Sequence, residues 1–317
     1  MAKHIQLSNG VQMPTLGLGT WQGTGNEVKD AVRIALKNGY RLFDTATVYG
    51  NEAEIGEVLQ DFIASGKIKR EDIFITTKLG WMFNRAEEVE VQLRESLSKL
   101  RLDYVDLYLI HVPVSFDRTH SHHDLAVKVT DIWKGMENVY EKKLTRAIGV
   151  SNFNSDQIDR IQRMAKVPIH NNQVELHLYF NQKALRAACQ KHNISVTAYA
   201  PIGSPGRTDT PLPNNFSFKF GAAPNPLENE TVLRLAKKYN KTPAQILLRH
   251  LVQLGISVIP KSTNEKRIVE NSQIFDFNLS NGEIQELDNA PQAPRIFKLE
   301  FMAGHPEDSI ADERAQQ

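Results

Sequence analysis

Short apolar runs alternate with longer amphipathic stretches along most of this 317-residue chain. The short runs are typical of buried strands and predict them at 16–19, 41–44, 73–78, 105–111, 147–151, 172–175, 194–199 and 256–259. The longer stretches carry apolar residues at helical spacing, and predict helices at 26–37, 51–64, from about 86, 131–143, 155–164, 181–190, from 242 and at 264–271. Ser155, Asn181 and the pair Thr242-Pro243 are the expected starts of three of these helices.

This alternation predicts an α/β protein whose parallel sheet is covered by helices on its outer side. Eight strand–helix units over roughly 250 residues fit a closed (β/α)8 barrel, the TIM-barrel fold, better than an open doubly wound sheet. No linker interrupts the pattern near its middle, so residues 1–317 are expected to form a single barrel domain.

Four segments lie outside the alternation. Residues 1–14 read as a β-hairpin around Asn9-Gly10, because this dipeptide accepts the positive φ angles of a tight turn, and the hairpin is expected to plug one barrel end. Segments 112–130 and 201–226 are long loops that follow strands, and 291–317 is a tail carrying Phe297 and Phe301. These three are expected to form walls and a lid at the C-terminal face of the barrel.

Composition narrows the class of partner. Lys and Arg number 38 against 37 Asp and Glu, which gives no electrostatic basis for binding nucleic acid or a membrane surface. The single cysteine, Cys189, falls in a helical pattern and reads as a buried structural thiol. With no signal peptide and no apolar run of membrane-spanning length, a cytoplasmic protein is expected.

Polar residues cluster where the predicted strands end, which is where barrel enzymes carry their chemistry. They are Asp44, Lys78, His111, Ser151, Asn152, Gln173, Glu175, Tyr199 and Lys261, with Tyr49 in the loop after the second strand. Any one of these residues alone is explained equally well as a turn residue, a solvent-exposed strand end or a hydrogen-bonded side chain in the core. Four titratable groups in consecutive units, Asp44, Tyr49, Lys78 and His111, are better explained by a shared chemical role.

That role is acid catalysis by tyrosine. A free phenol has a pKa near 10, so it is a poor acid unless a neighbouring cation stabilises the phenolate. Lys78 is expected to supply that cation, Asp44 to hold Lys78, and His111 to orient a substrate oxygen. Proton delivery to a carbonyl is productive only with a hydride, which requires a cofactor.

The cofactor cannot occupy a Rossmann site, since no Gly-x-Gly-x-x-Gly follows a predicted strand. Instead, Lys261, Ser262, Thr263 and Arg267 surround the start of the last helix, the usual phosphate corner of barrels. Two cations there suit the additional phosphate of NADPH, although an ordinary solvated helix start would have the same sequence.

The sequence resembles the aldo-keto reductase family over nearly its whole length. The matching motifs are Gly17-Leu18-Gly19-Thr20-Trp21, Phe43-Asp44-Thr45-Ala46, Tyr49-Gly50-Asn51-Glu52, Thr77-Lys78-Leu79, Asp106 to His111, Ile148 to Phe153 and Ile259-Pro260-Lys261-Ser262. The resemblance implies NADPH-dependent reduction of aldehydes or ketones to alcohols by a monomer, with a tetrad of Asp44, Tyr49, Lys78 and His111 and Tyr49 as proton donor. It implies cofactor contacts from Thr20, Trp21, Asp44, Ser151, Asn152, Gln173, Tyr199, Ile202, Ser204, Lys261, Ser262, Thr263, Arg267, Glu270 and Asn271.

The chain departs from the family pattern at two places. Many members pair a lysine after Thr-Trp with an aspartate after Gly-Ser-Pro as a latch over the cofactor, whereas this chain has Gln22 and Gly206. A looser loop and faster cofactor release are therefore expected. Val112 stands where aldehyde-reducing members have tryptophan, and the substrate pocket is expected to comprise Trp21, Val48, Tyr49, Trp81, His111, Val112 and residues of the tail.

Two other functions and one metal site are compatible with parts of the sequence. A regulatory or structural protein of the same fold would bind the cofactor with little turnover, and the intact tetrad argues against it. A metal-dependent barrel hydrolase or isomerase would need clustered carboxylates and histidines at strand ends, which are lacking. His120, His122 and His123 lie in one loop but have no acidic or cysteine partners at metal-ligand spacing, so no metal site is expected there.

Overall fold

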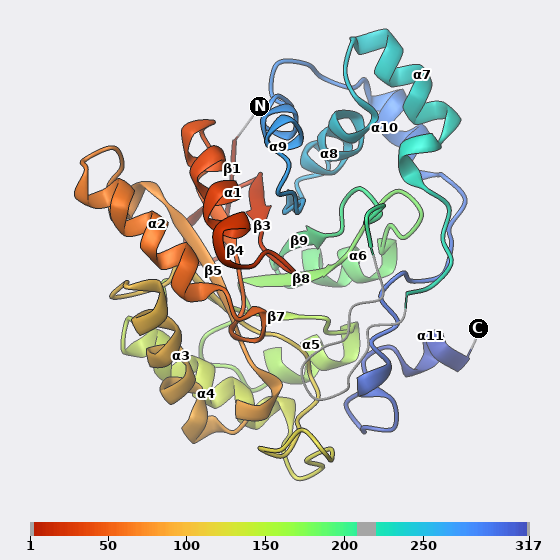
Figure 1. Cartoon of the computed structure of the whole chain (residues 1–317). Coiled ribbons are helices and arrows are strands. Elements are labelled where there is room, and N and C mark those ends of the chain that lie inside the picture. The colour runs from red at the N-terminus through yellow and green to blue at the C-terminus, as the bar shows by residue number, and fades with distance from the viewer. Residues whose placement is uncertain (1–2, 208–219, 316–317) are drawn as a thin grey trace.

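The computed structural model describes residues 3–207 and 220–315 and shows a sheet of eight parallel strands in the order of the chain (Figure 1). The strands are β3 (Gly17–Gly19), β4 (Leu42–Asp44), β5 (Phe74–Leu79), β6 (Leu107–Ile110), β7 (Ile148–Ser151), β8 (Asn171–Glu175), β9 (Ser195–Tyr199) and β10 (Ser257–Val258). All eight coincide with predicted strands, and burial on both faces explains why most of them read as apolar runs, although β8 is buried and mostly polar.

The first and last strands meet and close the sheet into a barrel. Leu16 bridges Val258 and Gly19 bridges Lys261, both in parallel orientation. A Cβ atom on Gly19 would lie 2.7 Å from the carbonyl oxygen of Ile259, so the two strands approach this closely only because residue 19 is glycine. The predicted closed (β/α)8 barrel is confirmed.

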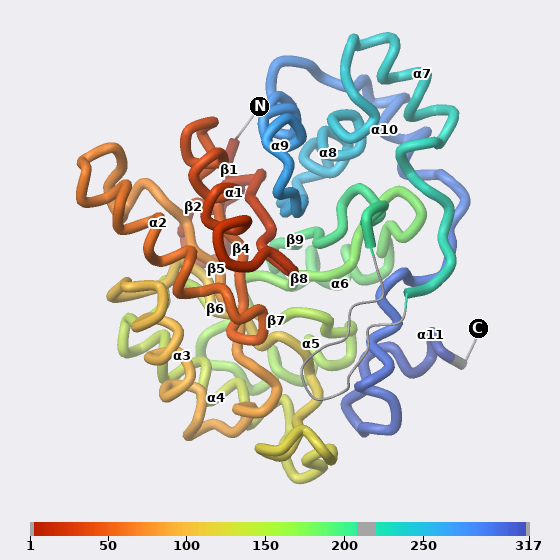
Figure 2. Tube along the Cα trace, in the orientation of Figure 1, coloured from red at the N-terminus to blue at the C-terminus, as the bar shows by residue number. Residues whose placement is uncertain are grey.

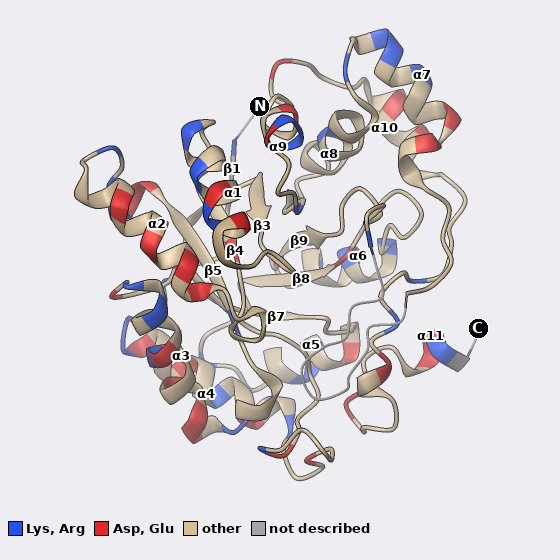
Figure 3. Cartoon of the chain, viewed as in Figure 1, with Lys and Arg blue, Asp and Glu red and all other residues tan. Residues whose placement is uncertain are grey.

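Helices surround the barrel, and those that belong to the strand–helix units cover its outside in chain order (Figure 2). They are α1 (Gly25–Lys37), α2 (Glu52–Ala64), α3 (Ala86–Leu100), α4 (Val129–Glu141), α5 (Ser155–Gln162), α6 (Lys183–Lys191), α7 (Glu230–Tyr239), α8 (Pro243–Gln253), α9 (Glu265–Ser272), α10 (Asn281–Asp288) and α11 (Ala311–Ala315). Figure 3 shows both acidic and basic residues along α1 and α3, and acidic residues alone along α2. None of the helices in the described part of the chain is long and apolar enough to cross a bilayer.

The N-terminal hairpin closes the end of the barrel from which the strands start. Its strands β1 (His4–Gln6) and β2 (Gln12–Pro14) pair antiparallel, with Ile5 opposite Met13. Leu7 and Met13 are buried in one cluster with Leu42, Phe74 and Leu107 from the barrel strands. The predicted plug is confirmed, and it leaves the C-terminal ends of the strands as the open face.

Several local predictions were wrong. Helices α7, α10 and α11 were not expected, because they lie outside the strand–helix alternation from which the pattern was read. Helix α5 is capped by Asn154 rather than Ser155, and the Asn154 side chain accepts a hydrogen bond from the Gln157 amide. At α6 the capping position is Gln182, with a positive φ, and Asn181 accepts from the Lys183 amide instead.

The loops and the tail gather over the open face. The loop after β6 runs to the start of α4, as predicted within two residues. The loop 201–226 was expected to form a wall, but its stretch 208–219 lies outside the described residues. Its far end pairs with the tail, since Phe220 and Phe297 form an antiparallel bridge. The tail therefore folds back over the C-terminal ends of the strands, as predicted.

Candidate active site

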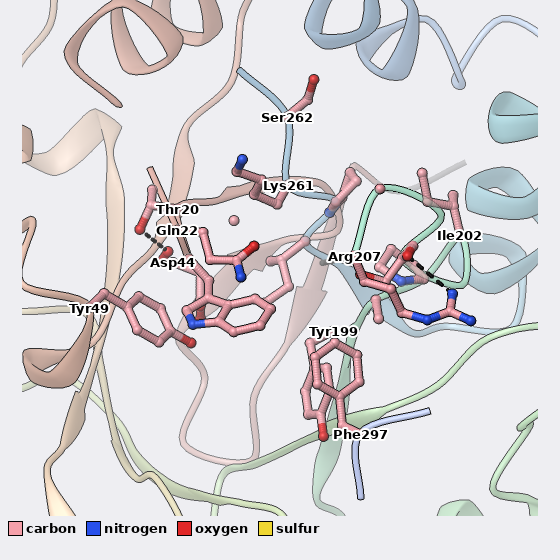
Figure 4. A pocket seen from close by; sticks show the side chains of 18 of the residues that line it. Thr20, Gln22, Asp44, Tyr49, Tyr199, Ile202, Arg207, Lys261, Ser262 and Phe297 are labelled. Atoms are coloured by element: carbon pink, nitrogen blue, oxygen red, sulfur yellow. Dashed lines mark hydrogen bonds between the residues drawn. The ribbon is translucent and has the colours of Figure 1, made fainter. Parts of the chain in front are cut away.

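A cavity of about 910 Å³ opens at the C-terminal ends of the strands. Every residue predicted for catalysis, cofactor or substrate lines it except Lys78, which is fully buried directly beneath Asp44 and Tyr49. Figure 4 shows Tyr49 and Asp44 on one side of this cavity and Tyr199, Ile202 and Arg207 on the other. The barrel thus brings together residues that lie as far apart as 20 and 271 in the sequence.

Asp44 and Lys78 form a buried ion pair at the ends of two neighbouring strands. Lys78 Nζ lies 2.5 Å from Asp44 Oδ1 and 2.9 Å from the carbonyl oxygen of Thr45. Asp44 Oδ2 accepts a hydrogen bond of 2.6 Å from the Gln173 amide. Burial raises the pKa of Asp44 and lowers that of Lys78, and the attraction between the two charges opposes both shifts.

Tyr49 ends a 3-10 turn that starts at Thr47, and Gly50, with a positive φ, follows it. Its hydroxyl accepts a hydrogen bond of 3.4 Å from Lys78 Nζ. Burial, and secondarily the charge of Asp44, raise the pKa of Tyr49 well above its ordinary value. The sequence predicts that Lys78 lowers the pKa of Tyr49. The shift has the opposite direction, because the loss of solvation of the phenolate outweighs the attraction of the nearby cation in the free protein.

His111 follows β6 and stands edge-on to Tyr49, with ring centroids 5.6 Å apart and planes at 76°. Burial, and secondarily the charge of Lys78, lower the pKa of His111 well below its ordinary value. Its Nδ1 atom is buried without a hydrogen-bond partner in the described part of the chain. The ring is therefore neutral where it contacts the Tyr49 ring.

Hydroxyl and amide groups form the floor of the cavity between the tetrad and the far wall. The hydroxyl of Ser151 donates to the carbonyl oxygen of Gln173 at 2.8 Å. Asn152 has a positive φ, and its side-chain oxygen accepts a hydrogen bond of 2.8 Å from the Tyr199 hydroxyl. The Tyr199 ring is thus held at the cavity wall by a residue two strands away.

The predicted phosphate corner lies at the other end of the cavity. Lys261, Ser262 and Thr263 precede α9, whose first turn is capped by the Asn264 side chain. Lys261 and Arg267 are exposed to solvent, and neither pairs with an acidic side chain within residues 3–207 and 220–315. Two uncompensated cations at a helix N-terminus suit a phosphate group.

The end of the cavity near Tyr49 is aromatic and apolar. Trp21, Val48, Trp81 and Val112, all predicted for substrate, lie there. Phe297 and Phe301 were expected only as residues of the tail, and Met82, His120, Leu299 and Arg207 were not expected at the cavity, although all six line it. Loop and tail residues carry no strand-end signal, so their positions could not be predicted.

The three loop histidines lie in different surroundings. His120 lines the cavity, His122 lies 3.3 Å from Asp117, and His123 lies 2.8 Å from the carbonyl oxygen of Phe301. Within the described ranges no group of three or more His, Cys, Asp or Glu side chains is placed to hold a metal ion.

Comparison with known proteins decides the family. The Aldo/keto reductase family profile matches residues 15–291. The chain belongs to the aldo-keto reductase family. Among its relatives, aldo-keto reductase family 1 member A1 of Gallus gallus is 44% identical over 293 residues, which cover 89% of this chain and 87% of that protein. A Danio rerio relative, member A1-A, is 43% identical over 299 residues, or 91% of this chain and 90% of that one.

Solved structures of aldo-keto reductases share the whole fold. The aldose reductase of Schistosoma japonicum superposes with a TM-score of 0.89 at 41% identity, covering 98% of this chain and all of that one. A Bombyx mori aldo-keto reductase, solved in complex with NADP, gives 0.88 at 37% identity, covering 98% of this chain and 99% of that chain. These relatives indicate that the protein is an oxidoreductase acting on carbonyl compounds.

Proposed function

We propose that this aldo-keto reductase reduces aldehydes or ketones to alcohols with NADPH, and that Tyr49 delivers the proton. The observation that carries the proposal is the Asp44–Lys78–Tyr49 chain of contacts, 2.5 Å and 3.4 Å long, with His111 against the phenol ring. Asp44, Tyr49 and His111 line the cavity at its apolar end, which Trp21, Val48, Trp81 and Val112 form.

The cavity fits NADPH by the chemistry of its lining. Lys261, Ser262 and Arg267 at the start of α9 would hold the phosphate of the adenosine half, and the Tyr199 ring offers a flat face for the nicotinamide. The relative from Bombyx mori was solved with NADP and another aldo-keto reductase with NADPH. When bound, the cofactor supplies a hydride to the carbonyl carbon of the substrate.

The protein residues handle the proton. As the carbonyl oxygen gains negative charge, Tyr49 donates its phenolic proton to that oxygen, and Lys78 stabilises the phenolate left behind. Asp44 keeps Lys78 in place through the buried ion pair. Neutral His111 orients the substrate oxygen without competing as an acid. Solvent then returns a proton to Tyr49.

The test is Tyr49→Phe, which removes the proton donor and leaves the ring. We expect kcat for carbonyl reduction to fall at least about 100-fold, because a positioned general acid contributes about that much or more. Binding of NADPH, followed by quenching of tryptophan fluorescence, should stay within about threefold of wild type, since the phenol does not hold the cofactor.

Tyr108→Phe is a matched control. Tyr108 is buried on β6, and its hydroxyl has no hydrogen-bond partner among the described residues. Losing it should leave kcat unchanged. Near wild-type turnover by Tyr49→Phe would refute the role of Tyr49. A wild-type protein that binds NADPH but reduces no aldehyde or ketone would instead indicate a cofactor-binding protein without this activity.

A further inference from the structure

Glu175 is a buried charge at the active-site face to which the proposed mechanism gives no role. It ends β8, two residues after Gln173, whose amide binds Asp44. Its side chain has no exposure to solvent. A carboxylate is costly to bury unless hydrogen bonds and opposite charge compensate it, so its partners indicate what it does.

Those partners are backbone amides of the tail. Glu175 Oε1 accepts from the Ile296 amide at 2.7 Å, and Oε2 accepts from the Phe297 amide at 2.9 Å. Residues 121 and 122 positions away in the chain are thereby joined to Glu175 through both oxygens of its carboxylate. A neutral side chain of the same shape cannot accept both hydrogen bonds, because one oxygen would be replaced by a donor.

Two further groups keep Glu175 charged. His177 Nε2 lies 3.0 Å from Oε1, and Arg295 Nη1 lies 3.7 Å from Oε2 while its Nε binds Glu313 of α11 at 2.8 Å. Burial alone would raise the pKa of Glu175, but the hydrogen bond with His177 and the charge of Arg295 hold it below the ordinary value. The carboxylate is therefore a permanent acceptor at neutral pH.

The segment that Glu175 holds forms part of the cavity wall. The ring of Phe297 stands edge-on to Trp21 at 5.7 Å and to Tyr199 at 5.4 Å (Figure 4). On its other side the same segment is bound to the loop after β9, since the Gly221 amide donates to the carbonyl oxygen of Ile296 at 2.6 Å. A Cβ on Gly221 would lie 2.3 Å from the carbonyl oxygen of Arg295.

We propose that Glu175 is a positioning residue for substrate selection. Its carboxylate fixes the backbone of Ile296 and Phe297, so that the Phe297 ring limits the space available to the substituents of the carbonyl substrate beside Trp21. The inference rests on the proposed reductase function. Strand β8 accordingly has two positioning residues, because Gln173 holds Asp44 and Glu175 holds the segment that carries Phe297 into the cavity wall.

The experiment compares Glu175→Gln with wild type on benzaldehyde, a small substrate, and benzophenone, a bulky one. With Phe297 released, the ratio of kcat/KM for benzophenone to that for benzaldehyde should rise about tenfold, mainly through KM. Binding of NADPH should stay within about threefold. Unchanged substrate preference in a folded Glu175→Gln variant would overturn the proposal.

Glu307→Gln is the matched control. Glu307 also ties the tail to the barrel, through Arg160 at 2.6 Å and 2.8 Å, but it does not contact Ile296 or Phe297. It should leave the substrate ratio unchanged. An equal change in both variants would show that any loosening of the tail is sufficient and would also overturn the specific role of Glu175.

A double-mutant cycle separates positioning from general destabilisation. Phe297→Ala should raise the ratio as Glu175→Gln does, and the combined variant should show no further rise, because both act through the same ring. Fully additive effects would contradict the proposal. If Glu175→Gln does not fold, Gly221→Ala takes its place, since its Cβ displaces the same segment without touching the carboxylate.

Hydrogen exchange gives a readout that does not depend on turnover. The amides of Ile296 and Phe297 should exchange at least about tenfold faster in Glu175→Gln and not in Glu307→Gln. If wild type reduces neither carbonyl, the proposed function fails, and this measurement still decides whether Glu175 holds the wall. Unchanged exchange at these two amides would refute it.

Discussion

Tyr49 holds its proton firmly in the free protein, because its phenolate would be formed in a desolvated cavity beside the carboxylate of Asp44. Lys78 Nζ, 3.4 Å away, does not reverse this direction. In the proposed reaction the Tyr49 phenolate forms only as the proton passes to a charged substrate oxygen. Lys78 therefore stabilises the transition state more than it shifts the pKa of Tyr49 in the resting protein.

This arrangement makes a prediction about pH. A proton donor is active only while protonated, and a pKa raised above 10.0 keeps Tyr49 protonated throughout the neutral range. The kcat for carbonyl reduction should therefore stay flat from about pH 6 to about pH 9, measured with saturating NADPH and substrate. A decline centred below about pH 8 would mean that Lys78 lowers the pKa of Tyr49 in the working complex.

At the scale of elements, helix starts show where local sequence is ambiguous. Ser155 and the preceding Asn154 are both good capping residues, and the sequence does not rank them. In the structure Asn154 and Gln157 exchange hydrogen bonds of 3.0 Å and 3.2 Å, and the Asn154 amide group also binds the carbonyl oxygen of Ser309 in the tail. The tertiary contact with the tail favours Asn154.

A pair of variants tests this capping assignment. Asn154→Ala should lower the free energy of unfolding by about 1 kcal/mol, because the first turn of α5 loses its cap. Ser155→Ala, which removes no cap, should change it by less than about 0.5 kcal/mol. Urea denaturation of both variants measures the difference. Equal losses in the free energy of unfolding would contradict the assignment of Asn154 as the cap.

At the scale of the whole molecule, the barrel places Gln22 and Gly206 on the lining of one cavity although a long stretch of chain separates them. Figure 4 shows Gln22 on one side and Arg207, the neighbour of Gly206, on the other. The two positions that lack the charged latch residues therefore face the same cavity, where a latch would act. A Cβ on Gly206 meets nothing within 4 Å, so a side chain is sterically allowed there.

Restoring both charges tests whether the missing latch speeds cofactor release. In the double variant Gln22→Lys/Gly206→Asp, release of NADPH should slow by about fivefold, which corresponds to a surface ion pair of about 1 kcal/mol. Stopped-flow fluorescence measures this rate. Gln22→Lys alone serves as the control and should give a smaller effect. If the double variant releases NADPH as fast as wild type, the latch is not what sets the rate.

The sequence by itself determined the barrel, because each strand is buried on both faces and each principal helix on one, and these patterns are local. It also predicted that Asp44, Tyr49 and His111 would share one face with Lys261 and Arg267, since strand ends converge on one face in any such barrel. The tertiary structure alone decided the direction of the Tyr49 pKa, which depends on how deeply the cavity is enclosed. It also decided the role of Glu175, because its partners Ile296 and Phe297 lie in a tail without periodic pattern and reach it only when the chain is folded.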